Sequence, residues 1–185
     1  MNAKNIFLGL GGAGRNILNL LIDCGIPSTE TLYADTDINA VPASKSNMFI
    51  RLGGELLCGR GTGAKPLLGL EAARASSDEI IGAVKNAQTL FLIAGLGGGV
   101  GSGSVAYIAE ITKPYVEKIV AVVTVPAKYE GDKRNNNAKQ ALDDLRSVMD
   151  GTNVYVIEHV DTVCASIDIS DKAVCDTVMT LRKTL

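Results

Sequence analysis

A glycine-rich segment between an apolar strand and a helix is the feature that most limits how this chain folds. Residues 94–104 hold six glycines and two serines and directly follow the buried-strand pattern of Thr89–Ala94. Helical spacing of apolar residues resumes over Val105–Ile111, so the glycines lie where the carboxyl end of a strand meets a helix N-terminus. Ordinary strand-to-helix loops take about 2–6 residues and need a single glycine, which disfavours a merely flexible turn. The segment is therefore predicted to hold a phosphate group on its backbone N–H groups.

The composition indicates a globular protein with no general attraction for polyanions. The chain of 185 residues is long enough for one domain, or one domain with an appendage, and 46% of its residues are hydrophobic. Its formal net charge of −2 gives no field that would attract nucleic acid or an anionic membrane surface. The longest apolar run, Ile119–Val125, is too short to cross a bilayer. We therefore expect a cytoplasmic protein that binds no nucleic acid and does not insert into membranes.

Cysteine and histidine usage narrows the possible chemistry. The four cysteines, at positions 24, 58, 164 and 175, show no C-x-x-C spacing, and His159 is the single histidine. A structural zinc site would therefore lack ligands, and a histidine-based nucleophilic triad is disfavoured. We expect the cysteines to be reduced, and we expect any chemistry to be phosphoryl transfer supported by carboxylates, solvent or a metal.

Strand and helix patterns alternate along the chain, which indicates an α/β fold. The predicted strands are Asn5–Leu10, Thr31–Ala34, Met48–Arg51, Thr89–Ala94, Lys118–Val125 and Asn153–Glu158. Helical patterns lie between them near 14–23, 69–85, 103–113 and 132–149. Right-handed crossovers then give a doubly wound, mostly parallel sheet with helices on both faces, and they place every glycine-rich loop at one edge of the sheet.

Two helical segments carry further expectations. The segment Ser170–Leu185 has an apolar stripe and Ser170 as its predicted N-cap, and it either docks on the sheet or requires a further partner. The three asparagines at 135–137 are poor helix formers at the start of another helix and are predicted to be solvated.

A second glycine pattern, near the N-terminus, allows a different interpretation. Gly9-Leu-Gly11-Gly-Ala-Gly14 follows the first strand and matches G-x-G-x-x-G, with Asp35 and Asp37 about twenty residues further on. By itself this pattern is typical of an NAD-dependent oxidoreductase domain. A dinucleotide domain gives no reason for the second loop at 95–103, whereas two phosphate loops on one edge fit a single triphosphate.

Several motifs, in sequence order, resemble the GTPase domain of the FtsZ/tubulin family, and FtsZ more than tubulin. Residues 95–103 are similar to the family's glycine-rich signature loop, Gly61–Pro66 to its third loop, and Pro126–Arg134 to the FtsZ sugar-binding loop. The resemblance covers almost the whole chain. It implies a Rossmann-like domain whose cofactors are GTP or GDP and Mg²⁺, and whose partners are FtsZ-like subunits of the same or a related protein.

The resemblance also assigns roles to residues at matching positions. Asp37 would lie near the magnesium ion and its waters. Asp171 would accept hydrogen bonds from guanine N1–H and the 2-amino group, which adenine cannot offer; a first-turn aspartate that favours the helix dipole is the alternative. The implied phosphate-binding residues are Gly11, Gly12, Gly63, Ala64, Lys65, Gly97, Gly98, Gly99, Val100, Gly101 and Ser102, and the implied ribose- and base-binding residues are Asn16, Glu130, Arg134, His159 and Asp171.

Three positions depart from the family pattern. Val100 stands where the signature loop usually has Thr, which removes one hydroxyl contact and leaves the backbone donors in place. Lys65 replaces an Asn beside the expected terminal phosphate, where its ammonium either adds a charge-assisted contact or is solvated. His159 replaces an Asn that contacts sugar or base, and it either hydrogen-bonds the ligand or is a loop histidine.

The chain also lacks a catalytic motif of the family. In this family GTP is hydrolysed between subunits by an acidic loop after the central helix, and its Gly-x-x-Asn-x-Asp-x-x-Asp pattern does not occur in the 185 residues. We therefore expect a GTP-binding domain over 1–169, the start of the central helix, cut short, over 170–185, and no second domain. Such a chain would bind GTP, hydrolyse it weakly or not at all alone, and cap or modulate filaments of a full-length relative. A non-hydrolysing interaction module is the remaining alternative.

Overall fold

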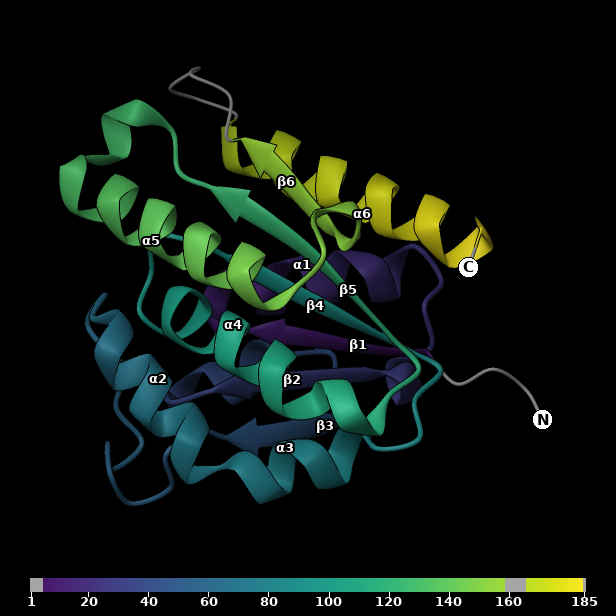
Figure 1. The fold of residues 1–185 in the computed structure, drawn as a ribbon, viewed down its shortest axis with the longest axis horizontal. Helices are drawn as coiled ribbons and strands as arrows, with labels where there is room; N and C mark the ends of the chain where they lie inside the picture. The colour runs from purple at the N-terminus through teal and green to yellow at the C-terminus, as the bar shows by residue number, and fades with distance from the viewer. Residues whose placement is uncertain (1–4, 159–165, 185) are drawn as a thin grey trace.

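The computed structural model describes residues 5–158 and 166–184 and contains a six-stranded sheet (Figure 1). The strands are β1 (Asn5–Leu10), β2 (Thr31–Asp35), β3 (Met48–Arg51), β4 (Thr89–Gly95), β5 (Lys118–Val125) and β6 (Val154–Glu158). Their order across the sheet is β3-β2-β1-β4-β5-β6, and every pairing is parallel. The order therefore reverses between β1 and β4. In open parallel sheets such a point forms a ligand crevice beyond the carboxyl ends of the strands.

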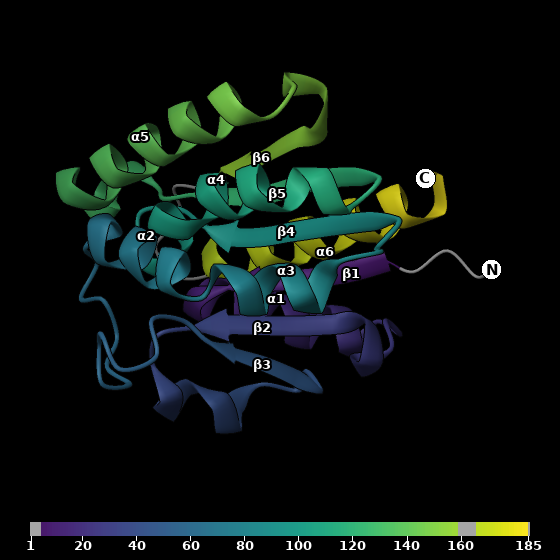
Figure 2. The same ribbon diagram turned by 60° about the horizontal axis from the view of Figure 1, so that its bottom comes forward.

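Helices cover both faces of the sheet (Figures 1 and 2). On one face lie α2 (Pro66–Ala75), α3 (Ser77–Val84), α4 (Val100–Thr112) and α5 (Asp132–Val148), and on the other lie α1 (Gly11–Asp23) and α6 (Ser166–Thr184). Short 3₁₀ turns complete the connections: η1 (Ser28–Glu30), η2 (Ile38–Ala43), η3 (Lys113–Tyr115), η4 (Lys128–Glu130) and η5 (Gly151–Asn153). The predicted doubly wound α/β fold is confirmed. Among the residues that the structure describes, no helix has the length and apolar character needed to span a bilayer.

Two apolar cores, one on each face, hold the layers together. Alternate residues of the central strands enter opposite cores, so Leu8 and Leu92 pack beneath α2–α5 while Phe7 and Phe91 pack beneath α1 and α6. The Phe7 and Phe91 rings stack with their centroids 4.7 Å apart. Because both faces are buried, the central strands read in the sequence as continuous apolar runs.

The last helix, α6, docks on the sheet and on α1. Arg182 near its end places its guanidinium carbon 6.0 Å from the centroid of the Phe7 ring, and its Nη2 donates to Glu30 Oε2 at 3.1 Å. Of the two alternatives for this helix, the structure therefore shows docking. The predicted N-cap is wrong, because α6 begins at Ser166 and Ser170 is a buried residue inside it.

Two other helices have boundaries that differ from the prediction. The helix predicted over 69–85 is two helices, because Ser76 leaves the helical path and its Oγ accepts a hydrogen bond from Gly53 N at 3.0 Å. This bond gives the backbone N–H of Gly53, in the turn that follows β3, an acceptor. Helix α4 begins at Val100, inside the segment predicted as a loop, because its glycines fit close contacts: a Cβ on Gly101 would meet the carbonyl oxygen of Gly95.

Glycines also set how closely α1 lies against the strands. A Cβ on Gly9 would stand 2.5 Å from Leu18 Cδ1, and a Cβ on Gly14 would stand 2.8 Å from the carbonyl oxygen of Ile93. In contrast, nothing lies within 4 Å of a Cβ added to Gly12. Two glycines of the G-x-G-x-x-G pattern therefore serve helix–strand packing, while Gly12 faces open space.

We predict that Gly14→Ala destabilises the fold and that Gly12→Ala does not. The methyl group at position 14 meets rigid backbone, so the free energy of unfolding should fall by about 1–3 kcal/mol. At position 12 alanine meets no atom and favours the helix, so the change should stay below about 1 kcal/mol and be stabilising in sign. Urea unfolding followed by circular dichroism measures both variants, and equal losses of stability would contradict the packing role of Gly14.

Candidate functional site

A cleft of about 340 Å³ opens at the carboxyl edge of the sheet, where the strand order reverses. The strand arrowheads in Figure 1 all point toward this edge. Segments that follow β1, β2 and β4, together with residues 61–62 and the first turn of α5, form its walls. The lining residues are Leu10, Gly11, Gly12, Ala13, Asp35, Asp37, Gly61, Thr62, Gly95, Leu96, Gly98, Gly99, Val100, Gly101, Thr124 and Arg134.

Helices α1 and α4 both begin at this cleft with free backbone donors. Within the described part of the chain, neither N-cap residue, Leu10 for α1 or Gly99 for α4, has a side-chain capping hydrogen bond. In α4 the bond from Gly103 N to Gly99 O, 3.0 Å long, comes only after the first N–H groups, which have no acceptor in the helix. The positive ends of two helix dipoles therefore meet at one cavity, which favours a multiply charged anion there.

Ser102 closes the glycine loop on itself. Its Oγ accepts a hydrogen bond from Gly97 N at 2.7 Å, and the serine is buried. The hydroxyl proton of Ser102 stays available for donation, because the oxygen acts only as an acceptor in this bond. Both residues lie behind the cleft lining, so they shape the loop from beneath.

Glycines mark the points where neighbouring loops touch the signature segment. A Cβ on Gly99 would meet Thr62 Oγ1, and a Cβ on Gly97, whose φ is +98°, would stand 3.0 Å from the carbonyl oxygen of Arg134. A Cβ on Gly11 would stand 3.2 Å from Val100 Cβ. Loops that are distant in sequence are thus brought to backbone contact around one cavity. A Cβ on Gly98, in contrast, would meet nothing within 4 Å, so this residue faces the open cleft.

Asn137 joins two of these loops from α5. Its Nδ2 donates to Ala64 O and to Gly97 O, both at 3.3 Å. The neighbouring Asn135 donates through Nδ2 to Gly131 O at 3.0 Å. The prediction that the asparagines are solvated is therefore wrong for these two, since amide side chains can saturate loop carbonyls that have no ladder partner.

A buried carboxylate stands at the end of β2, on the wall of the cleft. Asp35 Oδ1 accepts hydrogen bonds from Thr36 N at 2.7 Å and Asp37 N at 3.3 Å, while Oδ2 accepts from the Tyr33 hydroxyl. Burial, and then this bond to Asp35, raise the pKa of Tyr33 above its ordinary value, so the phenol stays a donor. Asp35 therefore holds the turn that presents Asp37 to the cleft.

The donor set at Asp35 and Asp37 suits a magnesium ion carried by phosphates. Mg²⁺ keeps several waters and takes only one or two carboxylates when it binds together with phosphate oxygens. Outside the gaps at 1–4, 159–165 and 185, no group of three or more His, Cys, Asp or Glu residues could hold a metal by itself. Asp37 Oδ1 accepts from Asn39 N at 2.9 Å, which orients the carboxylate without covering both oxygens.

Arg134 is the guanidinium that lines the cleft, and Glu130 positions it. Arg134 Nε lies 3.5 Å from Glu130 Oε2, one helical turn back along the chain. Glu130 Oε1 accepts a hydrogen bond from Ala127 N at 2.9 Å, and its side chain is only 14% exposed, against 51% for Arg134. The carboxylate is fixed and the cation remains free to move toward an anion.

The remaining predicted residues lie around the cleft or apart from it. Gly63, Ala64 and Lys65 belong to the loop beside Thr62, and Lys65 is exposed at the N-cap of α2. Asn16 is exposed on α1, one turn beyond Gly12, where Arg15 Nη2 donates to its Oδ1 at 3.0 Å. Asp171 is buried on α6, which packs beside α1. His159 lies outside the described residues.

Four polar residues at or beside the cleft were not predicted to bind ligand. Thr62 sits inside the predicted third loop, so its neighbours signalled its place. In the sequence, Asp35 was noted only because its spacing after the first strand fits the dinucleotide-binding pattern. Thr124 and Asn137 gave no signal, because a threonine ending an apolar strand and an asparagine in a polar helix are unremarkable in sequence.

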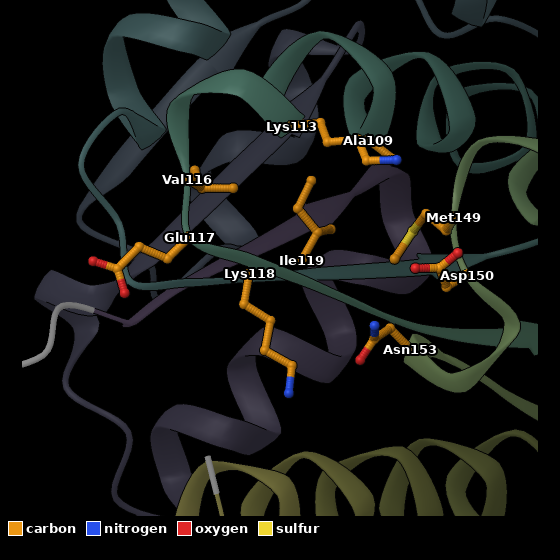
Figure 3. Close-up of a pocket in the computed structure, with 9 residues that line it drawn as sticks. All are labelled: Ala109, Lys113, Val116, Glu117, Lys118, Ile119, Met149, Asp150 and Asn153. Atoms are coloured by element: carbon orange, nitrogen blue, oxygen red, sulfur yellow. The ribbon is translucent and has the colours of Figure 1, made fainter.

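A second cavity, of about 190 Å³, lies at the opposite edge of the sheet (Figure 3). It is lined by Ala109, Lys113, Val116, Glu117, Lys118, Ile119, Met149, Asp150 and Asn153. Lys118 begins β5, and the last turn of α4 ends there, so helix carbonyls rather than N–H groups approach it. The lining holds two lysines, Lys113 and Lys118, and two acidic residues, Glu117 and Asp150, so it carries no net positive charge to attract an anion. The carboxyl-edge cleft is therefore the better candidate.

Comparison with known proteins identifies the family to which the chain belongs. Residues 4–164 match the protein family described as "Tubulin/FtsZ family, GTPase domain". The chain belongs to the Tubulin/FtsZ family. It is 38% identical over 143 residues to the cell division protein FtsZ of Mycoplasmopsis pulmonis, covering 77% of this chain and 36% of that protein. It is 38% identical over 148 residues to FtsZ 1 of Methanocaldococcus jannaschii, covering 80% and 41%.

Solved structures agree with this placement. A structure titled as an empty FtsZ dimer of M. jannaschii superimposes with a TM-score of 0.88 at 33% identity, over 96% of this chain and 54% of that one. TubZ from the Clostridium botulinum phage c-st reaches a TM-score of 0.80 at 20% identity, which shows the shared fold alone. The chain thus spans about half the length of the FtsZ structure and less of the FtsZ sequences it matches.

We predict that Asn137→Ala loosens both loops at the cleft. Without the amide donor, the carbonyls of Ala64 and Gly97 lose their shared partner, which costs about 1–2 kcal/mol of local stability. Hydrogen–deuterium exchange of peptides covering 61–66 and 97–102 should speed up by about 5- to 30-fold, the equivalent of that energy. Asn136→Ala, at the exposed neighbouring position, is the matched control and should leave both peptides unchanged. Equal effects of the two variants would contradict the bridging role.

Proposed function

We propose that this chain binds a guanine nucleotide, GTP or GDP, with the phosphates in the carboxyl-edge cleft. The observation that carries the proposal is the meeting of two uncapped helix N-termini, α1 and α4, at the switch point of a Tubulin/FtsZ-family sheet. Backbone donors around Gly11, Gly12 and Gly98–Gly101 would hold the phosphate oxygens. Mg²⁺ would be held through water by Asp37 and would neutralise phosphate charge.

Sugar and base recognition would come from residues at the ends of the cleft. Arg134 would donate to ribose or phosphate oxygens, and its ion pair with Glu130 supports this role. Asn16 and Asp171 stand on α1 and α6, helices in contact with each other, where a buried carboxylate would select guanine by pairing with N1–H and the 2-amino group. Lys65 and His159 are secondary candidates for phosphate and sugar contacts.

We propose that these 185 residues alone hydrolyse GTP slowly or not at all. Of the two carboxylates that line the cleft, Asp35 is held on both oxygens by Tyr33 and Thr36, and Asp37 would be engaged by the water shell of Mg²⁺. A carboxylate tied in this way is poorly placed to take a proton from an attacking water. Hydrolysis would then depend on an acidic group supplied by a partner.

We also propose that the chain contacts another FtsZ-like subunit. Large apolar side chains are exposed on segments that follow strands and face the same edge as the cleft, including Leu67 at 65% exposure and Tyr129 at 52%. Such a surface would let the chain cap or modulate filaments of a longer relative in the cytoplasm.

We predict that GTP stabilises the chain in thermal unfolding and that ATP and NAD do not. A ligand at about 100 times its dissociation constant adds about 2.7 kcal/mol to the stability. Stabilisation by NAD alone would instead favour a dinucleotide oxidoreductase domain. Anion-exchange identification of the nucleotide released from denatured protein gives an independent answer.

Gly98→Val should abolish this stabilisation while the protein stays folded. A Cβ on Gly98 meets nothing within 4 Å, so valine fits the fold and fills the cleft. Affinity should fall at least about tenfold, the equivalent of about 1.4 kcal/mol. Gly82→Val on α3, equally open in the structure, is the matched control and should bind normally. Partner binding that survives in Gly98→Val would favour an interaction module with a structural pocket.

With GTP, the chain alone should form no sedimenting filaments and release phosphate slowly. When these 185 residues are added in substoichiometric amounts to a full-length FtsZ that they contact, they should shorten the filaments, because their cleft face would occupy one end of a subunit contact. Gly98→Val serves as the nucleotide-free control in the same sedimentation and phosphate-release assays. Filaments formed by the chain alone in a GTP-dependent way would overturn this proposal.

A further inference from the structure

A pair of cysteine thiols joins α1 to α6, on the sheet face away from α2–α5. Cys24 is the C-cap residue of α1, and Cys175 lies in the middle of α6. Their sulfur atoms are 3.4 Å apart, although 151 positions separate them in the chain. The fold alone brings them together, because α1 and α6 pack side by side over Phe7 and Phe91.

The two thiols differ in access to solvent. Cys24 is exposed, whereas Cys175 is only 3% exposed. A cavity of about 330 Å³ opens above them, lined by Leu20, Cys24, Lys172, Cys175 and Asp176. A small oxidant therefore meets the exposed Cys24 first, while Cys175 contributes little surface at the wall of the same cavity.

We propose that Cys24 and Cys175 form a reversible intramolecular disulfide when the protein meets a hydroperoxide. A disulfide needs a sulfur–sulfur distance of about 2.0 Å, so the sulfurs must approach by little more than an ångström. Cys24 ends its helix beside Gly25, whose φ is +99°, so the moving side chain belongs to the turn rather than to the helix interior. Such a pair fits the transient, redox-sensing disulfides of reducing compartments. This inference does not depend on nucleotide binding.

The chemistry proceeds in two balanced steps. The Cys24 sulfur attacks the hydroperoxide, an S–O bond forms as the O–O bond breaks, and the leaving oxygen departs as an alcohol or water with the thiol proton. Cys24 is then a sulfenic acid, oxidised by two electrons, and the peroxide is reduced. The Cys175 sulfur attacks the Cys24 sulfur next, the S–S bond forms as the S–O bond breaks, and hydroxide leaves with the Cys175 proton as water.

The order of these steps follows from the surroundings of Cys175. Burial, followed by its contact with Cys24, raises the pKa of Cys175 to about 12. Because the thiolate is the reactive form, Cys175 does not react first and serves as the resolving thiol. The finished disulfide would tie α1, which carries Gly12 and Asn16, to α6, which carries Asp171.

The test is peptide mapping of the full chain after brief treatment with hydrogen peroxide and blocking of the remaining thiols. Trypsin places the four cysteines on four separate peptides, so each possible link has its own mass. We expect a cross-link between peptides 16–45 and 173–182, lighter than their sum by two hydrogen atoms and lost on reduction. Cys58 is the matched control, because it is exposed on another loop with its Sγ donating to Glu55 O at 3.3 Å.

Serine variants distinguish a specific Cys24–Cys175 pair from unspecific oxidation of exposed thiols. Cys24→Ser and Cys175→Ser should each abolish the cross-link, and Cys58→Ser should retain it. In Cys175→Ser the sulfenic acid on Cys24 should persist and be trapped by dimedone, which reports the order of the steps even if the variant is less stable. A link that involves Cys58 or Cys164, or a wild-type Cys24 that passes to sulfinic acid without linking, would overturn the proposal.

Discussion

The close approach of backbone to backbone at the carboxyl edge of the sheet is the constraint on which the rest of this structure depends. Helices α1 and α4 start beside each other after neighbouring strands and lie so close to those strands that side chains are excluded at Gly9, Gly14 and Gly101. The two helices also approach each other, since a Cβ on Gly11 would stand 3.2 Å from Val100 Cβ. This nearness directs two sets of unpaired N–H groups into one cavity. The proposed anion site is therefore a property of the main chain, and Val100, where the family pattern usually has Thr, leaves these backbone donors in place.

Side chains then hold this backbone arrangement in position. Asn137 donates to both the third loop and the signature loop, Asp35 fixes the turn after β2, and Glu130 restrains Arg134. Asn137 contacts segments 73 and 40 positions away, whereas Asp35 and Glu130 contact neighbours in their own turns. Asn137 and Glu130 stand outside the cleft lining, whereas Asp35, Asp37 and Arg134 are the charged residues in it, and most of the remaining lining comes from glycine-rich loops. Such a site suits a ligand that brings its own charge and its own metal ion.

The sequence predicted the fold well, and it predicted that the glycine-rich loops meet at one edge of the sheet, for physical reasons that particular segments show. The strands appear as apolar runs because both faces of the sheet are buried, and helices between them force parallel connections. Helix ends were harder to predict. The split at Ser76 depends on a hydrogen bond with Gly53, and the early start of α4 depends on contacts of Gly101 and Gly103 with other elements. Neither contact has a local signature.

The sequence by itself determined which residues have no side chain, where strands end, and which family the motifs resemble, because glycine content, apolar periodicity and motif order are local properties. Only the tertiary structure decided that Asn135 and Asn137 bind loop carbonyls and that Cys24 lies against Cys175. It also decided that two glycines of the N-terminal pattern serve packing while Gly12 and Gly98 face the cleft. Apart from the Asn135 bond to Gly131, four positions away, most of these are relations between segments distant in the chain, and the folding of α1, α4, α5 and α6 onto one sheet creates them.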